Sequence, residues 1–319
     1  MPNILTQKGA RCLQRTWRLN SLDMLIDYAI RAVAEEASLR AIVSRTTRLV
    51  DEARVKHFTY PTATAALGRL LTGAAMMGMT LKGNERLSLL IKGDGPLGQL
   101  LAVSRSDGFV KGYVAEPQTH LPLNSSGKLD VGKAVGKGML YITKDLGLKE
   151  PYKGGSSLTT GEIADDLTNY FAASEQTPSA VALGVLVDVD NSVKAAGGFL
   201  VQLMPGASNS SVEKLEQNLA RIKSVSEHFA LGKTPEELLA SLFKGFDYEI
   251  LEKQKLRFFC DCSRSNMERV LLSLGKDELI SLKEEQKGAE IRCHYCNQAY
   301  QFSEQELTDL AKQVSKGGQ

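Results

Sequence analysis

The apolar positions from Met24 onward follow two periods, and strand-like runs outnumber helical ones. A two-residue period is typical of strands with one buried face, and a period near 3.6 is typical of helices. Strand-like runs occupy residues 40–45, 86–92, 98–104, 109–114, 138–143, 180–187 and 193–203. Helical spacing occupies residues 49–58, 61–81 and 161–171. The predicted fold class is α+β, with an N-terminal α/β domain over 24–206 whose sheet is mainly antiparallel.

In residues 207–255 the spacing of apolar residues becomes helical, and this segment is predicted to form a helical linker. Apolar residues recur there at helical spacing with charged residues between them, as Val212, Leu215, Leu219 and Ile222. A second helix is predicted after Thr234, because Thr caps, Pro235 takes the first helical position and Glu237 stands three residues after the cap. Its apolar face needs a surface to pack on, and the first domain supplies one. That face consists of Leu238, Leu239, Leu242 and Phe243.

The remaining residues, 256–319, contain four cysteines in two close pairs and are therefore predicted to form a small C-terminal zinc-binding domain. A short strand at 256–259 leads into the first two cysteines. Residues 265–268 have the form of a capping box that opens a helix ending at Gly275, and residues 303–306 have the same form before the last helix. Between these helices, residues 289–302 have the pattern of strand, knuckle and strand.

Composition and charge restrict the function classes. The chain has 319 residues, 43% of them hydrophobic, which is enough for a sizeable core and a smaller unit. Its net charge is +2, but residues 1–23 carry four basic side chains against Asp23, so the rest carries −1. Residues 256–319 hold nine Lys or Arg against ten Asp or Glu. This balance disfavours a nucleic-acid-binding module.

Two segments bear on location. Residues 61–81 are long enough to span a bilayer, but Arg69 in their middle and many small residues favour a buried helix of a soluble protein. Residues 1–23 lack the apolar core of a secretory signal. They can be a transit-like leader, a tail or an upstream extension before a start at Met24, and the last is favoured. A cytoplasmic protein without membrane contact is expected.

The cysteines carry the most specific signal. Four of the five lie between 260 and 296, while Cys12 stands apart. They form a Cys-Xaa-Cys pair, Cys260 with Cys262, and a Cys-Xaa-Xaa-Cys pair, Cys293 with Cys296. Two close pairs separated by a foldable loop are typical of a four-thiolate zinc site, although 30 intervening residues are more than most zinc ribbons have. Four unrelated thiols and a ligand role for His294 are the alternatives.

A closed four-thiolate site predicts structural or redox chemistry. It leaves no open position for a catalytic water, so hydrolysis at zinc is disfavoured. Oxidants can attack such thiolates, and metal loss should unfold a unit of this size.

No other motif predicts catalysis. The glycines at 93–98 match a dinucleotide fingerprint, but a strand follows where a helix is needed. The glycine and lysine pattern at 127–133 lacks the Ser or Thr of a phosphate loop. His57, His120 and His228 have no partners at catalytic spacing. We therefore expect neither a nucleotide site nor an enzyme.

Beyond the two cysteine pairs, several segments resemble the redox-regulated, thirty-three-kilodalton heat-shock chaperones of bacteria and some organelles. The resemblance runs from about Met24 to the C-terminus. The segments that carry it are 61–63, 66–69, 144–148, 161–164, 174–176 and 196–206.

The resemblance implies an ATP-independent holdase that one Zn²⁺ per chain keeps inactive when reduced. Oxidation would form the disulfides Cys260 with Cys262 and Cys293 with Cys296, expel the zinc and unfold the C-terminal region. An active homodimer would then protect unfolding client proteins during oxidative and heat stress. A thiol oxidoreductase remains the enzymatic alternative, but it needs one exposed, low-pKa cysteine instead of four metal ligands.

Overall fold

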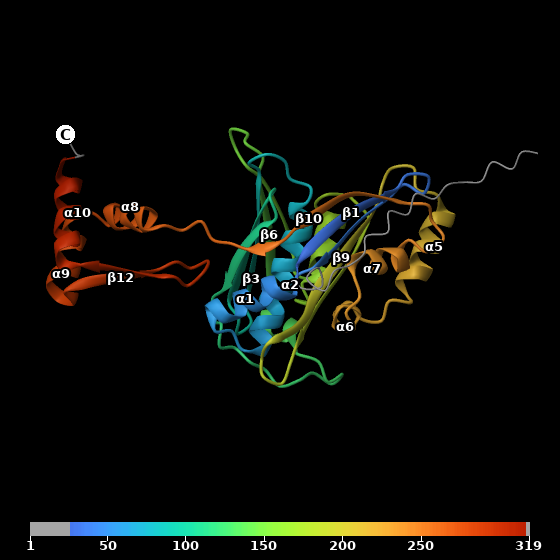
Figure 1. Cartoon of the computed structure of the whole chain (residues 1–319), viewed down its shortest axis with the longest axis horizontal. Coiled ribbons are helices and arrows are strands. Elements are labelled where there is room, and N and C mark those ends of the chain that lie inside the picture. The colour runs from blue at the N-terminus through green and yellow to red at the C-terminus, as the bar shows by residue number, and fades with distance from the viewer. Residues whose placement is uncertain (1–25, 317–319) are drawn as a thin grey trace, which may run out of the picture.

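The computed structural model describes residues 26–316, and its core is one long helix held between two sheets (Figure 1). This helix, α2 (Pro61–Gly78), contacts strands of both sheets and is buried along nearly its whole length. Its small residues allow the close approach, since a Cβ on Gly68 would lie 2.9 Å from Val185 Cγ2 in the five-stranded sheet. Arg69 forms an ion pair with Glu162, which compensates the charge within this apolar segment. The prediction of a buried helix is confirmed.

The five-stranded sheet is antiparallel throughout, in the order β10-β1-β2-β9-β8. Alternate residues of its strands face opposite layers: Ala29 and Ile42 join the core around α2, whereas Ile30 and Val43 face a second core. Both faces are therefore covered. The strands are β1 (Tyr28–Ala34), β2 (Leu39–Arg45), β8 (Ser179–Val187), β9 (Val193–Leu203) and β10 (Glu249–Lys255).

The six-stranded sheet lies on the other side of α2, in the order β11-β5-β4-β3-β6-β7. Neighbouring strands are antiparallel except β11, which pairs in parallel with β5. The strands are β3 (Arg86–Gly93), β4 (Gln99–Arg105), β5 (Phe109–Val114), β6 (Gly138–Asp145), β7 (Tyr152–Ser157) and β11 (Arg257–Phe258). The helices around them are α1 (Thr47–His57), α3 (Val131–Val135) and α4 (Ala164–Ala173). No helix in residues 26–316 is long and apolar enough to cross a membrane.

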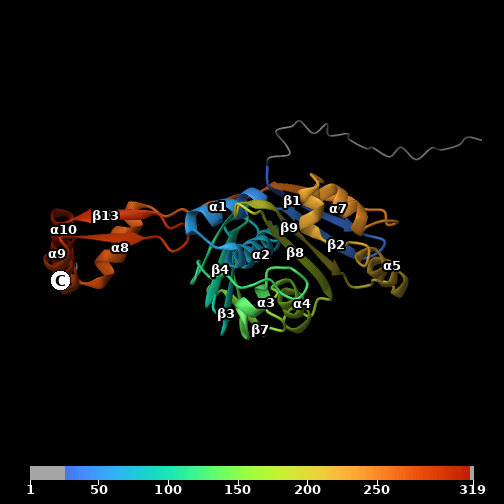
Figure 2. The ribbon, with the colours of Figure 1, turned by 90° about the horizontal axis from the view of Figure 1, so that it is seen from below.

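Three short helices cover the outer face of the five-stranded sheet (Figure 2). They are α5 (Asn209–Leu219), α6 (Val225–Ala230) and α7 (Pro235–Leu242). The predicted capping box before α7 is present, with Glu237 N donating to Thr234 Oγ1 at 3.2 Å and Thr234 N to Glu237 Oε2 at 2.7 Å. The predicted apolar face of α7 packs on β1 and β2, and Leu238, Leu239, Leu242 and Phe243 are all buried there. That prediction is confirmed.

The C-terminal unit extends beyond α1, away from the two sheets (Figures 1 and 2). It contains α8 (Arg264–Leu274), α9 (Lys276–Gln286), the hairpin β12 (Gly288–Arg292) and β13 (Ala299–Ser303), and α10 (Glu304–Lys316). Its own core is small. That core consists of Leu271, Leu279, Phe302, Leu307, Leu310 and Ala311.

The α+β class is confirmed, together with most of the predicted elements. The predicted capping box at 265–268 is wrong, because the helix begins earlier: Ser263 is extended and its Oγ accepts from Asn266 N at 3.3 Å. Strands β1, β7 and β10 and the short helices α3 and α6 were not predicted. The predicted capping box at 303–306 is confirmed by Ser303 N donating to Glu306 Oε2 at 2.8 Å. The proposed extension 1–23 lies outside the described residues.

Candidate metal centre

Cys260 and Cys262 are positioned by the six-stranded sheet. They follow β11, whose Arg257 and Phe258 pair with Phe109 and Val110 of β5. Phe259 continues this pairing, because its amide donates to the carbonyl of Val110 at 2.9 Å. The Phe259 ring also packs on that of Phe109, with centroids 4.5 Å apart. The first cysteine pair is therefore fixed to the large domain through main-chain hydrogen bonds and apolar packing.

Cys293 and Cys296 lie in the turn at the tip of the β12–β13 hairpin. The Cys293 amide donates to the Gln298 carbonyl at 3.0 Å, and the Cys293 carbonyl accepts from the amides of Cys296 at 3.3 Å and Asn297 at 2.7 Å. Asn297 adopts a left-handed conformation with φ of 57°, which Asn tolerates better than most residues. This turn brings both thiols of the pair to one side.

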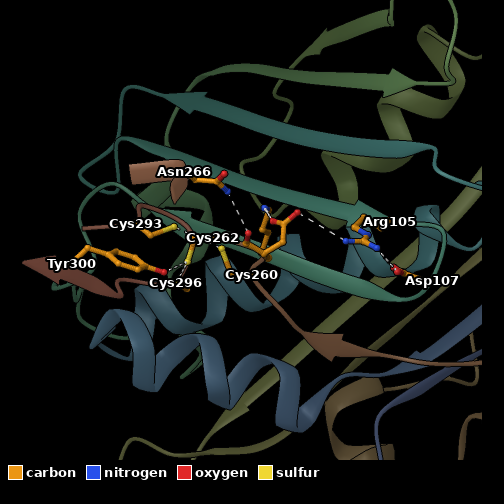
Figure 3. A network of polar contacts seen from close by, with 10 residues as sticks. Arg105, Asp107, Cys260, Cys262, Asn266, Cys293, Cys296 and Tyr300 are labelled. Carbon is orange, nitrogen blue, oxygen red and sulfur yellow. Dashed lines mark hydrogen bonds and ion pairs between the residues drawn. The ribbon is translucent and has the colours of Figure 1, made fainter. Parts of the chain in front are cut away.

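The two pairs meet, as Figure 3 shows, with their four sulfur atoms facing one another. All four Sγ atoms lie within 4.8 Å of one another. Cys260 Sγ is 3.7 Å from Cys293 Sγ, and Cys262 Sγ is 3.4 Å from Cys296 Sγ. Tetrahedral zinc with Zn–S bonds of about 2.3 Å places its sulfur ligands about 3.8 Å apart. The donor set and its spacing fit a metal ion of this kind.

Burial makes two of the four thiols hard to ionise. Burial raises the pKa of Cys260 above the ordinary thiol value, and it raises the pKa of Cys296 to about 11. Burial acts on Cys262 as well, but hydrogen bonds from Tyr300 and the neighbouring thiols outweigh it, and the pKa of Cys262 falls. Accumulating four thiolates here therefore requires positive charge, which a divalent metal supplies.

Polar residues surround the sulfur cluster (Figure 3). Tyr300 Oη lies 3.2 Å from Cys262 Sγ, and this hydrogen bond raises the pKa of Tyr300 to about 12, so the phenol remains a donor. Lys111 Nζ lies 2.5 Å from the carboxylate of Asp261, between the first two cysteines, and Arg105 lies 4.0 Å from the same carboxylate. These ion pairs add a second connection between the 260–262 segment and the six-stranded sheet.

The hairpin tip is docked on the large domain. His57 Nε2 lies 3.1 Å from the carbonyl oxygen of Tyr295, and Asn297 Nδ2 donates to the Lys56 carbonyl at 3.0 Å. The Tyr295 ring packs edge-on against Tyr113 of β5, with centroids 5.9 Å apart. The cysteines belong to the main hydrophobic core, not to the small core of the C-terminal unit. The sulfur cluster thus lies at the junction of the large domain and the C-terminal unit.

The other candidate residues of the sequence analysis do not belong to the four-cysteine cluster. Within the described residues, the four cysteines are brought together without His294, whose ring lies 5.9 Å from that of Tyr113. His120 and His228 hydrogen-bond to Thr62 and to the carbonyl of Thr234. The glycines at 93–98 form the turn between β3 and β4, and the predicted strand follows them. Sequence reasoning missed Tyr300 and the docking role of His57, since both contacts join residues far apart in the chain.

Two packed sheets, a helical segment and a four-cysteine centre together define a class of protein. Comparisons with known proteins agree on the family that has this combination. The Hsp33 protein family matches residues 27–303. The 33 kDa chaperonin of Desulforamulus reducens is 50% identical over 290 residues, covering 91% of this chain and 99% of its own. The 33 kDa chaperonin of Staphylococcus carnosus is 44% identical over 293 residues, covering 92% of this chain and 100% of its own.

A solved structure leads to the same family. The crystal structure of the 33 kDa chaperonin from Thermotoga maritima superposes with a TM-score of 0.86 at 39% identity, covering 91% of this chain and 99% of that one. The chain belongs to the Hsp33 family of 33 kDa chaperonins.

Proposed function

We propose that this protein is a redox-regulated, ATP-independent holdase, which binds unfolding proteins and prevents their aggregation without catalysing a reaction. One observation carries the proposal: four thiols join the hairpin tip to the segment that follows β11, at the junction with the large domain. Any chemistry that changes these thiols therefore changes how the C-terminal unit is held. Membership of a chaperonin family supports the chaperone activity.

In the reduced protein, Cys260, Cys262, Cys293 and Cys296 would hold one Zn²⁺ per chain. When bound, the ion supplies a structural cross-link whose apparent free energy is on the order of 10 to 16 kcal/mol. The C-terminal unit depends on such a cross-link, because its own core has six buried residues and part of its hairpin packs outside that core. This is the inactive form.

Oxidation converts each cysteine pair to a disulfide. The two sulfurs of a pair give two electrons to hydrogen peroxide, so that an S–S bond forms while the O–O bond breaks and the peroxide, taking up two protons, leaves as two water molecules. The sulfurs of the disulfide can no longer act as thiolate ligands. We propose pairing within Cys260–Cys262 and within Cys293–Cys296. The cross-pair sulfurs are close as well, at 3.7 and 3.4 Å. However, only neighbours in the chain stay close once the hairpin tip leaves the large domain.

Loss of the cross-link would then unfold residues 256–319 and loosen the linker, while residues 24–206 stay folded. Two disulfides that close short loops return only a few kcal/mol. Within the proposed linker of 207–255, strand β10 is held by pairing with β1, so we expect loosening to centre on α5, α6 and α7. Their apolar faces and the sheet beneath them would become available to client proteins.

The proposed partners are unfolded proteins and, in the oxidised state, a second copy of the chain. The cytoplasm, where thiols are kept reduced until stress, is the compartment that suits such a switch. Nucleic acid is not proposed, because the C-terminal unit carries nine basic against ten acidic residues.

The proposal is tested by measuring zinc content and aggregation of a chemically unfolded client, before and after peroxide and without ATP. Before peroxide, we expect one zinc per reduced chain. After peroxide, we expect the zinc to be lost and aggregation of the client to be suppressed. Cys296→Ser should bind zinc far more weakly, whereas Cys12→Ser, the control outside the cluster, should bind it normally. Equal suppression by the reduced, zinc-loaded protein would refute the switch, and turnover in insulin reduction would favour an oxidoreductase.

A further inference from the structure

Strand β8 forms an edge of the five-stranded sheet, and its composition is unusual for an edge. Its nine residues, Ser179–Val187, carry no charge and are mostly Val, Leu and Ala. All nine are partly exposed. Natural proteins ordinarily protect a long apolar edge with charges, proline or a covering element, because it is a template for another strand.

The pairing of β8 with β9 identifies the main-chain groups that face outward. The Leu203 amide donates to the Pro178 carbonyl at 3.0 Å, so even-numbered residues of β8 bond to β9 and odd-numbered residues point away. The outward amide of Val181 donates to Thr168 Oγ1 at 3.2 Å. Among the described residues, the main-chain groups of Leu183 and Val185 have no hydrogen-bond partner on this edge. Two successive positions are therefore open for pairing.

A groove of about 750 Å³ runs along this strand. One wall is the loop around Leu123 and Leu129, together with Arg69, whose buried Nε has no acceptor among the described residues. The other wall is the chain from Leu219 to Glu227, which joins α5 to α6. The groove combines apolar side chains with unused main-chain donors and acceptors, which is the environment an extended peptide needs.

We propose that the β8 edge binds an extended apolar segment of an unfolded polypeptide as an added strand. This inference rests on the proposed holdase function and gives it a site. Main-chain pairing recognises any sequence that can extend, which suits varied clients, and the uncharged strand favours apolar residues on them. The structured C-terminal unit is not needed to form the edge.

The second wall connects this site to the redox switch. Segment 224–227 packs closely against β8, since a Cβ added to Gly184 would lie 2.7 Å from the Ser226 amide nitrogen. In the reduced protein this wall restricts the groove. When α5 and α6 loosen, the groove opens, and affinity for an extended peptide should rise.

The test uses a fluorescein-labelled octapeptide of alternating valine and threonine with lysine at each end, and the same peptide N-methylated at alternate amides. Binding to the oxidised full chain is measured by fluorescence anisotropy. We expect the unmodified peptide to bind about tenfold more tightly than the methylated one, which has lost its hydrogen-bond donors. Leu123→Glu should weaken binding similarly, whereas Leu148→Glu, which is exposed on another loop, should not.

Five results would overturn the inference. Equal binding of the two peptides would show that main-chain pairing is not used, and equal binding by the two variants would place the peptide elsewhere. Binding only by a chain that begins at Met24 would show that the first residues of the chain itself are the occupant. A dimer disrupted by Leu123→Glu, without peptide binding, would identify a second copy. If the oxidised wild-type protein suppresses aggregation but binds no peptide, only this inference fails and the holdase function stands.

Discussion

Replacement of Asn297 by Gly should loosen the hairpin tip without altering the metal ligands. Asn297 Nδ2 donates to the Lys56 carbonyl at 3.0 Å, and this bond joins the cysteine turn to the end of α1. Glycine keeps the left-handed backbone at φ 57° free of strain and removes only the side chain. A hydrogen bond of this kind contributes about 1 kcal/mol net, so the undocked population should rise about fivefold.

The assay is the rate of zinc transfer to a chromogenic chelator under a fixed peroxide concentration. If undocking precedes attack on the thiols and is reversed quickly, the rate should rise about fivefold, in proportion to the undocked population. Asn191→Gly is the matched control, since Asn191 also has a positive φ, of 68°, and lies in the turn between β8 and β9. Equal rates for the two variants would refute the claim that docking on α1 protects the thiols.

Three further predictions concern stability and pairing. Burial raises the pKa of Asp27 to about 7, well above its value in an unfolded chain, so the native state binds the extra proton and stability falls as pH rises from about 4 to 7. Asp27→Asn should flatten that fall in thermal melts, and an unchanged pH dependence would contradict it. Leu307→Ala, in the small C-terminal core, should cost about 2 to 5 kcal/mol and lower the denaturant midpoint of the C-terminal unit, whereas Leu274→Ala, at an exposed position, should change it little. Peptide mapping of the oxidised protein should find disulfides within each cysteine pair, and dominant crosslinks between the pairs would exclude the proposed pairing.

Local patterns predicted much of the large domain because its strands alternate clearly and its helices carry strong end signals. Pro61 at the start of α2 and the capping box at Thr234 each placed a boundary correctly. Strand β10 escaped prediction because Glu249–Lys255 is rich in charged residues, and its strand conformation comes from pairing with β1 at the sheet edge. Tertiary context decides such segments.

The candidate metal centre, too, was predicted only in part from the sequence. Spacing alone predicted which cysteines cluster, because two short pairs suit one tetrahedral site. Spacing could not predict that the cluster would lie at the junction with α1 and β5, or that Tyr300 would donate to Cys262. Those contacts join residues more than 30 positions apart, and they determine what metal loss would release.

Hydrogen exchange on the reduced, zinc-loaded protein and on the oxidised protein, alongside a client aggregation assay, tests the central claim most directly. Oxidation should remove protection from residues 256–316 and weaken it in α5, α6 and α7, while α2 and the six-stranded sheet from β3 to β7 stay protected. Suppression of aggregation should appear on the same time course. If residues 256–316 remained protected after the zinc had left, while client aggregation was fully suppressed, unfolding could not be the switch.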